Sequence, residues 1–154
     1  MTRSRMALAG SVVLLLTGCG PRWDIRTAER LMVKGKWAEA ETLLQEVASS
    51  RAGTKWAQKA LMLKGCTQFK QGRLEDAELT LESARDEVAQ GEWADDAEYY
   101  LARVRFRKGD HETARAGFRR VMNEFGDDPK RSNCKALALE ELEYLEKKGS
   151  FDQG

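Results

Sequence analysis

The chain repeats a short pattern of residues at a fixed interval, and this period limits the folds that it can adopt. The segments GKWAEA, GRLEDA and GDHETA begin at Gly35, Gly72 and Gly109, so the glycine and the final alanine each recur after 37 residues. Such a period is the signature of one supersecondary unit that stacks on copies of itself, because a single unit cannot bury its apolar face alone. Other sets of similar residues also recur every 37 residues, and each such set is called a column. These columns are Ala28, Gly65 and Ala102; Met32, Phe69 and Phe106; Leu44, Leu81 and Phe118; Val47, Ala84 and Val121; and Trp56 and Trp93.

Each unit is predicted to be two helices joined by a tight turn. The glycine ends the first helix in a backbone conformation that a Cβ atom disfavours. The alanine of the second helix and the small residue of the first let the two helices approach closely. The composition agrees, because the chain is 33% charged, contains 2 prolines and is rich in the helix-forming residues Ala, Leu, Glu, Arg and Lys. We therefore expect an all-α fold.

The repeat also sets the expected bounds of the helices. A further helix over about 130–148 would cover the last apolar face, because Cys134, Ala138, Leu142 and Leu145 fall on one side of it. The expected helix pairs are 24–34 and 37–49, 55–71 and 74–89, and 93–108 and 111–125.

In these features the chain resembles the tetratricopeptide repeat family. The unit from Ala97 to Pro129, with its glycine turn at 109–111 followed by Phe118 and Val121, matches best. Family units are usually roughly 34 residues long, so each unit here has a few extra residues, which we place between units or at the helix ends. The resemblance covers nearly all of 22–149. It implies a tetratricopeptide-like α-solenoid of about three helix–turn–helix units plus a C-terminal capping helix.

The first residues are typical of a bacterial export signal. Arg3 and Arg5 precede an apolar stretch over 6–16, which is shorter than the ~20 residues that a membrane-spanning helix needs. The run Leu16-Thr17-Gly18-Cys19 resembles the lipobox of bacterial lipoproteins, which implies cleavage before Cys19 and its acylation with chains such as palmitate. The alternative is an ordinary secretory signal that ends at a cysteine. The expected division is a cleaved signal peptide at 1–18, a lipid anchor and tether at 19–23, the solenoid at 24–149 and a tail at 150–154.

Little in the sequence points to catalysis. The single histidine, His111, stands in the turn column, where packing at a helix start is expected. Cys66 and Cys134 lack a Cys-x-x-Cys spacing and fall on helices that should not touch, so we expect free thiols rather than a disulfide or a metal site. Without 1–18 the charges nearly balance, at 24 basic against 25 acidic residues, which argues against a nucleic-acid partner. We expect no enzymatic activity, no cofactor and no small-molecule substrate.

The resemblance implies a protein-binding surface on the first helix of each unit, which lines the concave face of tetratricopeptide superhelices. We predict a groove with an apolar floor and a basic edge, suited to an acidic partner segment that is extended or helical. The alternative is that its aromatic residues are ordinary inter-helix core and its cations are solvated. The concave positions that carry over by column are Ile25, Glu29, Met32 and Val33, then Met62, Cys66, Phe69 and Lys70, then Tyr99, Arg103, Phe106 and Arg107. The partner-binding residues predicted among them are Met62, Phe69, Lys70, Tyr99, Arg103, Phe106 and Arg107.

The combination of lipid anchor and repeats resembles the periplasm-facing helper lipoproteins of Gram-negative bacteria, which serve barrel assembly, secretin or pilus assembly and cell division. We expect an adaptor for other envelope proteins, anchored through Cys19 at the periplasmic face of the outer membrane. Gly20 rather than Asp after the cysteine resembles outer-membrane sorting. A small structural subunit without a groove is the alternative, and a redox enzyme using Cys66 is a third hypothesis. Trp23 is expected to pack in the first unit, with the membrane interface as its alternative position.

Overall fold

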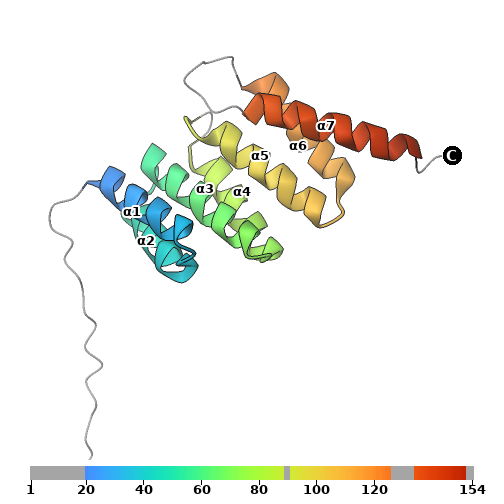
Figure 1. Ribbon diagram of the computed structural model, residues 1–154. Coiled ribbons are helices and arrows are strands. Elements are labelled where there is room, and N and C mark those ends of the chain that lie inside the picture. The colour runs from blue at the N-terminus through green and yellow to red at the C-terminus, as the bar shows by residue number, and fades with distance from the viewer. Residues whose placement is uncertain (1–19, 89–90, 126–133, 152–154) are drawn as a thin grey trace, which may run out of the picture.

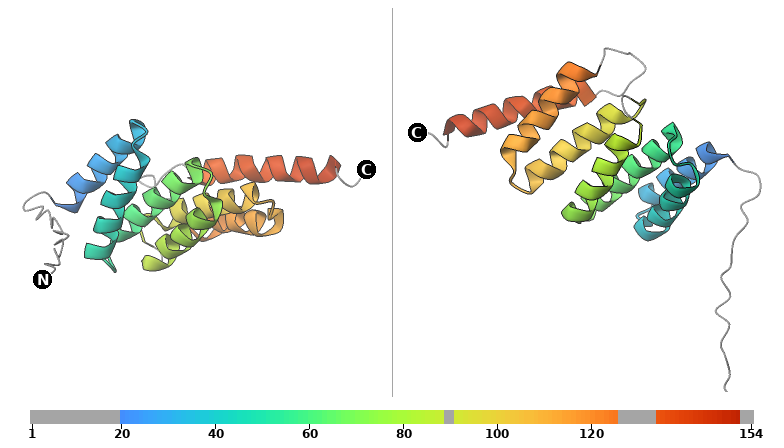
Figure 2. Two further views of the ribbon diagram at one scale, coloured as in Figure 1. Left: turned by 90° about the horizontal axis from the view of Figure 1, so that it is seen from below. Right: turned by 180° about the vertical axis from the view of Figure 1, so that it is seen from behind.

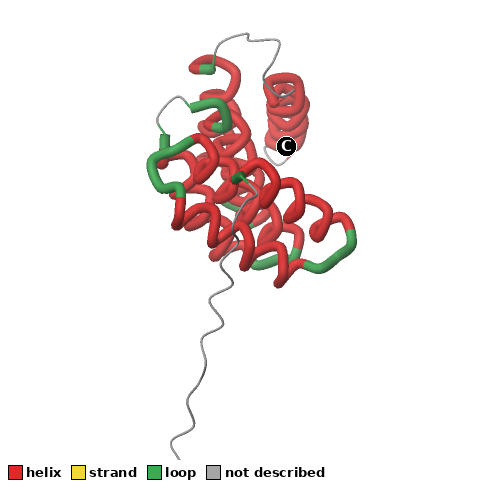
Figure 3. Tube along the Cα trace, turned by 90° about the vertical axis from the view of Figure 1, so that its left-hand side faces the viewer, coloured by secondary structure: helices red, strands yellow, loops and turns green. Residues whose placement is uncertain are grey.

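The computed structural model describes residues 20–88, 91–125 and 134–151, which form seven helices joined by turns (Figures 1 and 3). No strand occurs in these ranges, so the all-α prediction is confirmed. Within them no helix is long and apolar enough to cross a bilayer. The helices are α1 (Pro21–Val33), α2 (Trp37–Ser50), α3 (Lys55–Lys70), α4 (Leu74–Glu87), α5 (Ala94–Arg107), α6 (His111–Glu124) and α7 (Cys134–Phe151).

The helices stack in two layers. Consecutive helices pack as neighbours, and in addition α1 contacts α3, α3 contacts α5, and α5 contacts α7. The even-numbered helices α2, α4 and α6 make no such contacts with one another. The odd-numbered helices therefore form the closer, inner layer of a short solenoid, as the views in Figures 1 and 2 show.

Glycine forms the turn inside each unit, as predicted. Gly35, Gly72 and Gly109 have φ angles of 71°, 76° and 86°, which L side chains rarely adopt. In the second unit the N–H of Gly72 donates to the carbonyl of Phe69 at 3.0 Å, which satisfies an acceptor that the end of α3 would otherwise leave free.

Small residues bring the two helices of a unit together. A Cβ atom on Gly65 would lie 2.5 Å from the Leu81 side chain, and one on Gly117 would lie 2.9 Å from the Cβ of Ala102. The alanines of the second helices, Ala77 among them, are fully buried. The prediction that these columns serve close helix approach is confirmed.

The helix bounds agree with the predicted ones except at the two ends of the solenoid. α1 begins at Pro21 rather than 24, because proline suits the first turn, where a missing N–H costs nothing. α7 runs to Phe151 rather than 148. Pro129, which ends the unit that carried the family resemblance, lies outside the described residues.

The apolar core is divided among three clusters, and each of them spans adjacent units. The first unit's cluster includes Ala60 of α3, and the second unit's includes Ala97 and Leu101 of α5. The third is closed by α7, which buries Cys134, Ala138, Leu142 and Leu145 on the predicted side. Each unit thus buries its apolar face only by stacking on the next, as the repeat implied.

Candidate protein-binding surface

The seven predicted partner-binding residues all lie on α3 and α5 of the inner layer, but their exposure differs sharply. Met62, Phe69 and Tyr99 are buried, with 5%, 9% and 3% of their surface exposed. Phe106 and Arg103 are half-buried, whereas Lys70 and Arg107 are exposed. Much of the predicted groove floor is therefore inter-helix core, because α3 and α5 pack against each other as well as against α4 and α6.

The predicted basic edge does form above this floor. The guanidinium carbon of Arg103 lies 5.4 Å from the ring centre of Phe69 and 5.8 Å from that of Tyr99. That of Arg107 lies 5.5 Å from the Phe69 ring. Two cations from α5 thus stack on one aromatic ring from α3, a contact that is attractive because of the ring quadrupole.

Helix α7 covers the part of this surface that belongs to the third unit. Arg103 is paired with Glu141 at an Nε–Oε1 distance of 3.5 Å. The Phe106 ring meets Tyr144 edge-on, with ring centres 6.0 Å apart. The cations left accessible are Lys70 and Arg107, which are the last residues of α3 and α5.

The two internal cysteines are buried, and neither forms a disulfide within the part of the chain that the structure describes, as predicted. Burial is the main cause that raises the pKa of the Cys66 thiol above its ordinary value, and the carboxylate of Asp96 adds to it. The Cys134 thiol donates to Asp96 Oδ1 at 3.2 Å. α3 and α7 do not touch, but the layout is tighter than expected, because α5 alone separates them rather than a whole unit.

His111 begins α6 and is exposed, with its ring centre 5.2 Å from that of Phe106. It therefore packs at the turn, as its column suggested. In the part of the chain that the structure describes, no group of three or more His, Cys, Asp or Glu side chains could hold a metal ion.

Sequence reasoning missed a set of partly buried ion pairs that join α5 to its neighbours α4 and α6. Glu98 is almost fully buried and accepts from Arg120 Nη2 at 2.6 Å. Arg105 of α5 donates to both Glu78 and Glu82 of α4, at 3.0 Å and 2.7 Å. The 37-residue columns do not predict these ion pairs, because each pair joins residues from different columns on neighbouring helices. Their role is to align α4 and α6 against α5.

The structure also shows a hollow of about 570 Å³ that sequence reasoning did not foresee, between the starts of α1 and α3. Trp23, for which packing in the first unit was preferred, lies outside the core with 53% of its surface exposed, so that prediction is wrong. Among the described residues α1 is the first helix of the stack, so no described unit precedes it to cover this position. The residues that line the hollow are Arg22, Ile25, Arg26, Glu29, Lys55, Trp56, Lys59, Glu92 and Trp93.

Stacked helical hairpins with a glycine turn in each unit define an α-helical repeat protein. The sequence profile of the tetratricopeptide repeat matches residues 25–92 and 62–129, and the chain belongs to this family. A comparison with curated proteins finds no match. Tetratricopeptide repeats typically bind proteins rather than catalyse reactions, so the fold supports a protein-interaction role for this chain.

Proposed function

We propose that the protein is a lipid-anchored adaptor, which holds a partner protein at the periplasmic face of the outer membrane within an envelope assembly complex. The partner would belong to a barrel-assembly, secretin or pilus, or cell-division machinery. The observation that carries the protein-binding part is the stacking of Arg103 and Arg107 on Phe69, beside Lys70, at one edge of the inner layer.

The chemistry of this edge favours an acidic partner segment. Arg107 and Lys70 form no ion pair with any described residue, so their charges are available to carboxylates. The stacking holds the Arg107 side chain in place before a partner arrives, which lowers the conformational entropy lost on binding. Charges at an exposed edge mainly raise the association rate, and salt weakens their effect.

The anchor is supported by the Leu-Thr-Gly-Cys run, in which Cys19 lies outside the described residues. Each buried methylene contributes about 0.8 kcal/mol, so one acyl chain holds marginally and two or more anchor stably. Labelling cells with a radioactive fatty acid tests this directly. The unmodified protein should incorporate label, whereas Cys19→Ala should not, and equal labelling of both would remove the anchor from the proposal.

A structural subunit without a groove is the second candidate, and one observation favours it. α7 already occupies the surface of the third unit through Glu141 and Tyr144, so the open part of the inner layer is short. In that case partners would bind on the even-numbered helices or on the ends of the stack.

Charge reversal separates the two candidates. Lys70→Glu with Arg107→Glu changes the open edge and leaves the Arg103–Glu141 pair intact. Arg51→Glu with Arg119→Glu makes the same change in net charge at two exposed positions elsewhere. An adaptor predicts that recovery of partners from solubilised envelopes falls for the first pair at low salt and stays unchanged for the second. Equal recovery for both pairs would favour the structural subunit.

A further inference from the structure

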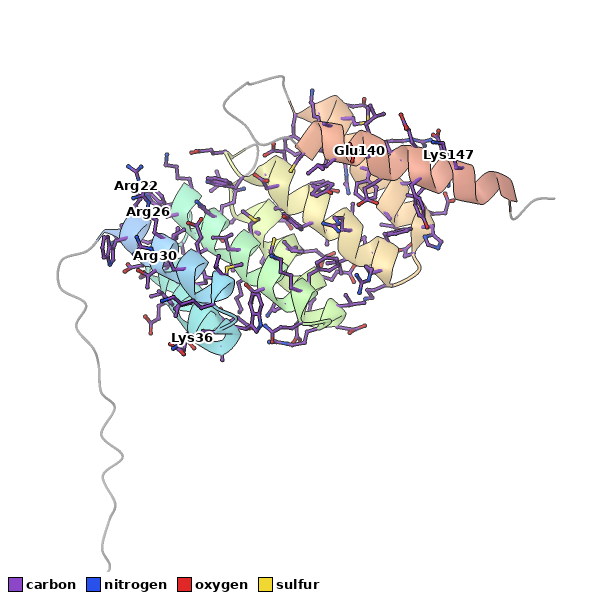
Figure 4. All side chains as sticks on the ribbon, in the orientation of Figure 1. Arg22, Arg26, Arg30, Lys36, Glu140 and Lys147 are labelled. Atoms are coloured by element: carbon purple, nitrogen blue, oxygen red, sulfur yellow. The ribbon has the colours of Figure 1, made fainter. Side chains whose placement is uncertain are left out.

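The outward face of α1 carries a stripe of unpaired positive charge. Arg22, Arg26 and Arg30 follow one another at intervals of four residues, so they lie along one side of the helix. All three are exposed and none forms an ion pair with a described residue. Figure 4 shows them in a line along α1 at the N-terminal end of the solenoid, with Lys36 beyond the following turn. Of the acidic residues on this helix, Glu29 is neutralised by Lys59 at 3.0 Å.

Tryptophan gathers at the same edge of the molecule. Trp23, Trp56 and Trp93 stand at or just before the starts of α1, α3 and α5, and these three helices run in the same direction. Trp56 and Trp93 line the hollow together with Arg22 and Arg26. Of the 4 tryptophans in the chain, only Trp37 begins a helix of the other layer. We call the surface formed by Arg22, Arg26, Arg30 and these three tryptophans the basic–aromatic edge.

The sequence places this edge next to the proposed anchor. Pro21, the first residue of α1, follows Cys19 by two residues. An extended backbone spans at most about 3.6 Å per residue. The start of α1 therefore lies within about 7 Å of an acylated Cys19. Tryptophan is favoured at the level of lipid headgroups, and clustered arginine is attracted to anionic ones.

We propose that the basic–aromatic edge is a docking surface for a bilayer that carries anionic phospholipid headgroups, an inference that rests on the proposed anchor. Arg22, Arg26 and Arg30 pair with headgroup phosphates, and Trp23 enters the interfacial layer. Lys70 and Arg107 lie at the opposite ends of α3 and α5, which are 16 and 14 residues long. At 1.5 Å per residue they stand about 20 Å along these helices from the starts that carry Trp56 and Trp93. Arg30 lies in the last turn of α1, so the arginine stripe extends along most of that helix.

Vesicle binding of the unlipidated chain tests this proposal without the anchor. Residues 20–154 contain every described helix and all three apolar clusters, so this fragment retains the fold. It should sediment with phosphatidylcholine vesicles that contain phosphatidylglycerol and much less with phosphatidylcholine alone. Each cation near an anionic surface changes the partition coefficient about fivefold, so Arg22→Glu, Arg26→Glu and Arg30→Glu together should lower it by about a hundredfold or more. The matched control is Arg51→Glu, Lys70→Glu and Arg119→Glu, which has the same net charge and should bind better than the α1 variant.

Two outcomes would overturn the proposal: no binding of the unmodified fragment to the anionic vesicles, or equal losses in both triple variants. A second measurement avoids charge reversal. Brominated lipids should quench the tryptophan fluorescence of the fragment, and Trp23→Phe should reduce this quenching while Trp37→Phe should not. Equal quenching in the two variants would also contradict it. Because the fragment has no lipid, these results are independent of fatty-acid labelling at Cys19 and of partner recovery.

Discussion

At the scale of single residues, small side chains set the spacing of the helices. Ala77 is fully buried on α4, and Gly65 faces Leu81 across the same helix pair. These positions were predictable from the sequence. The two helices of every unit approach closely only where a small residue stands, so small residues recur at the same position in each repeat.

Ala77→Trp should therefore lower the thermal unfolding temperature of residues 20–154 clearly. Overpacking typically costs about 1–3 kcal/mol, and the strain reaches neighbouring units of a short solenoid. Leu79→Trp is the control, because Leu79 lies on the same helix with 67% of its surface exposed. If both variants melted at the same temperature as the unmodified fragment, the close packing described for α3 and α4 would be wrong.

The buried Cys66 thiol makes stability depend on pH. Its pKa is raised above the ordinary value of 9.0, so above pH 9 the unfolded chain loses a proton that the folded chain keeps. The free energy of unfolding should then fall as pH rises, by up to about 1.4 kcal/mol per pH unit. Urea unfolding at pH 8, 9 and 10 should show this decline, and Cys66→Ala should make it shallower. An identical decline in that variant would show that Cys66 is not its source.

The exposure of the candidate site was harder to predict than its position. The columns placed Phe69, Arg103 and Arg107 together correctly, but Met62 and Tyr99 are core rather than groove floor. A column shows which side of a helix a residue occupies. It does not show how closely the next helix of the inner layer approaches, and that distance decides burial.

At the scale of helices, the turn glycines made the boundaries inside each unit predictable, whereas the start of α1 at Pro21 and the contacts of α7 were not predicted. Its apolar side was visible as Cys134, Ala138, Leu142 and Leu145. Its cover over Arg103 and Phe106 depends on side chains from its other faces, Glu141 and Tyr144, which belong to no repeated column. Figure 2 shows the last turns of α7 projecting beyond α5 and α6.

A pair of substitutions on α7 tests whether this helix is part of the cooperative core. Leu142 is buried against the third unit, whereas 44% of Leu139 is exposed. Leu142→Ala should cost about 2–5 kcal/mol of unfolding free energy, measured by urea denaturation of residues 20–154. Leu139→Ala should cost much less. Equal effects would mean that α7 is not packed as described.

At the scale of the whole molecule, the parallel inner helices separate two edges. Their starts carry the three tryptophans of the basic–aromatic edge, whose arginines run along α1, and the ends of α3 and α5 carry Lys70 and Arg107. The period of the sequence predicted the stack and hence the fold. The sequence does not identify the partner, because surface complementarity depends on the residues of both chains and this sequence gives only one of them.

Site-specific photo-crosslinking in living cells tests the central claim, that the open edge of an anchored solenoid binds a partner. A photoreactive residue would replace Arg107 in the full-length protein, and one at the exposed Arg119 would serve as the control. The account predicts a discrete crosslinked envelope protein from position 107, its absence from position 119, and its loss when Cys19→Ala removes the anchor. No crosslink at position 107, or the same crosslinks from both positions, would contradict it.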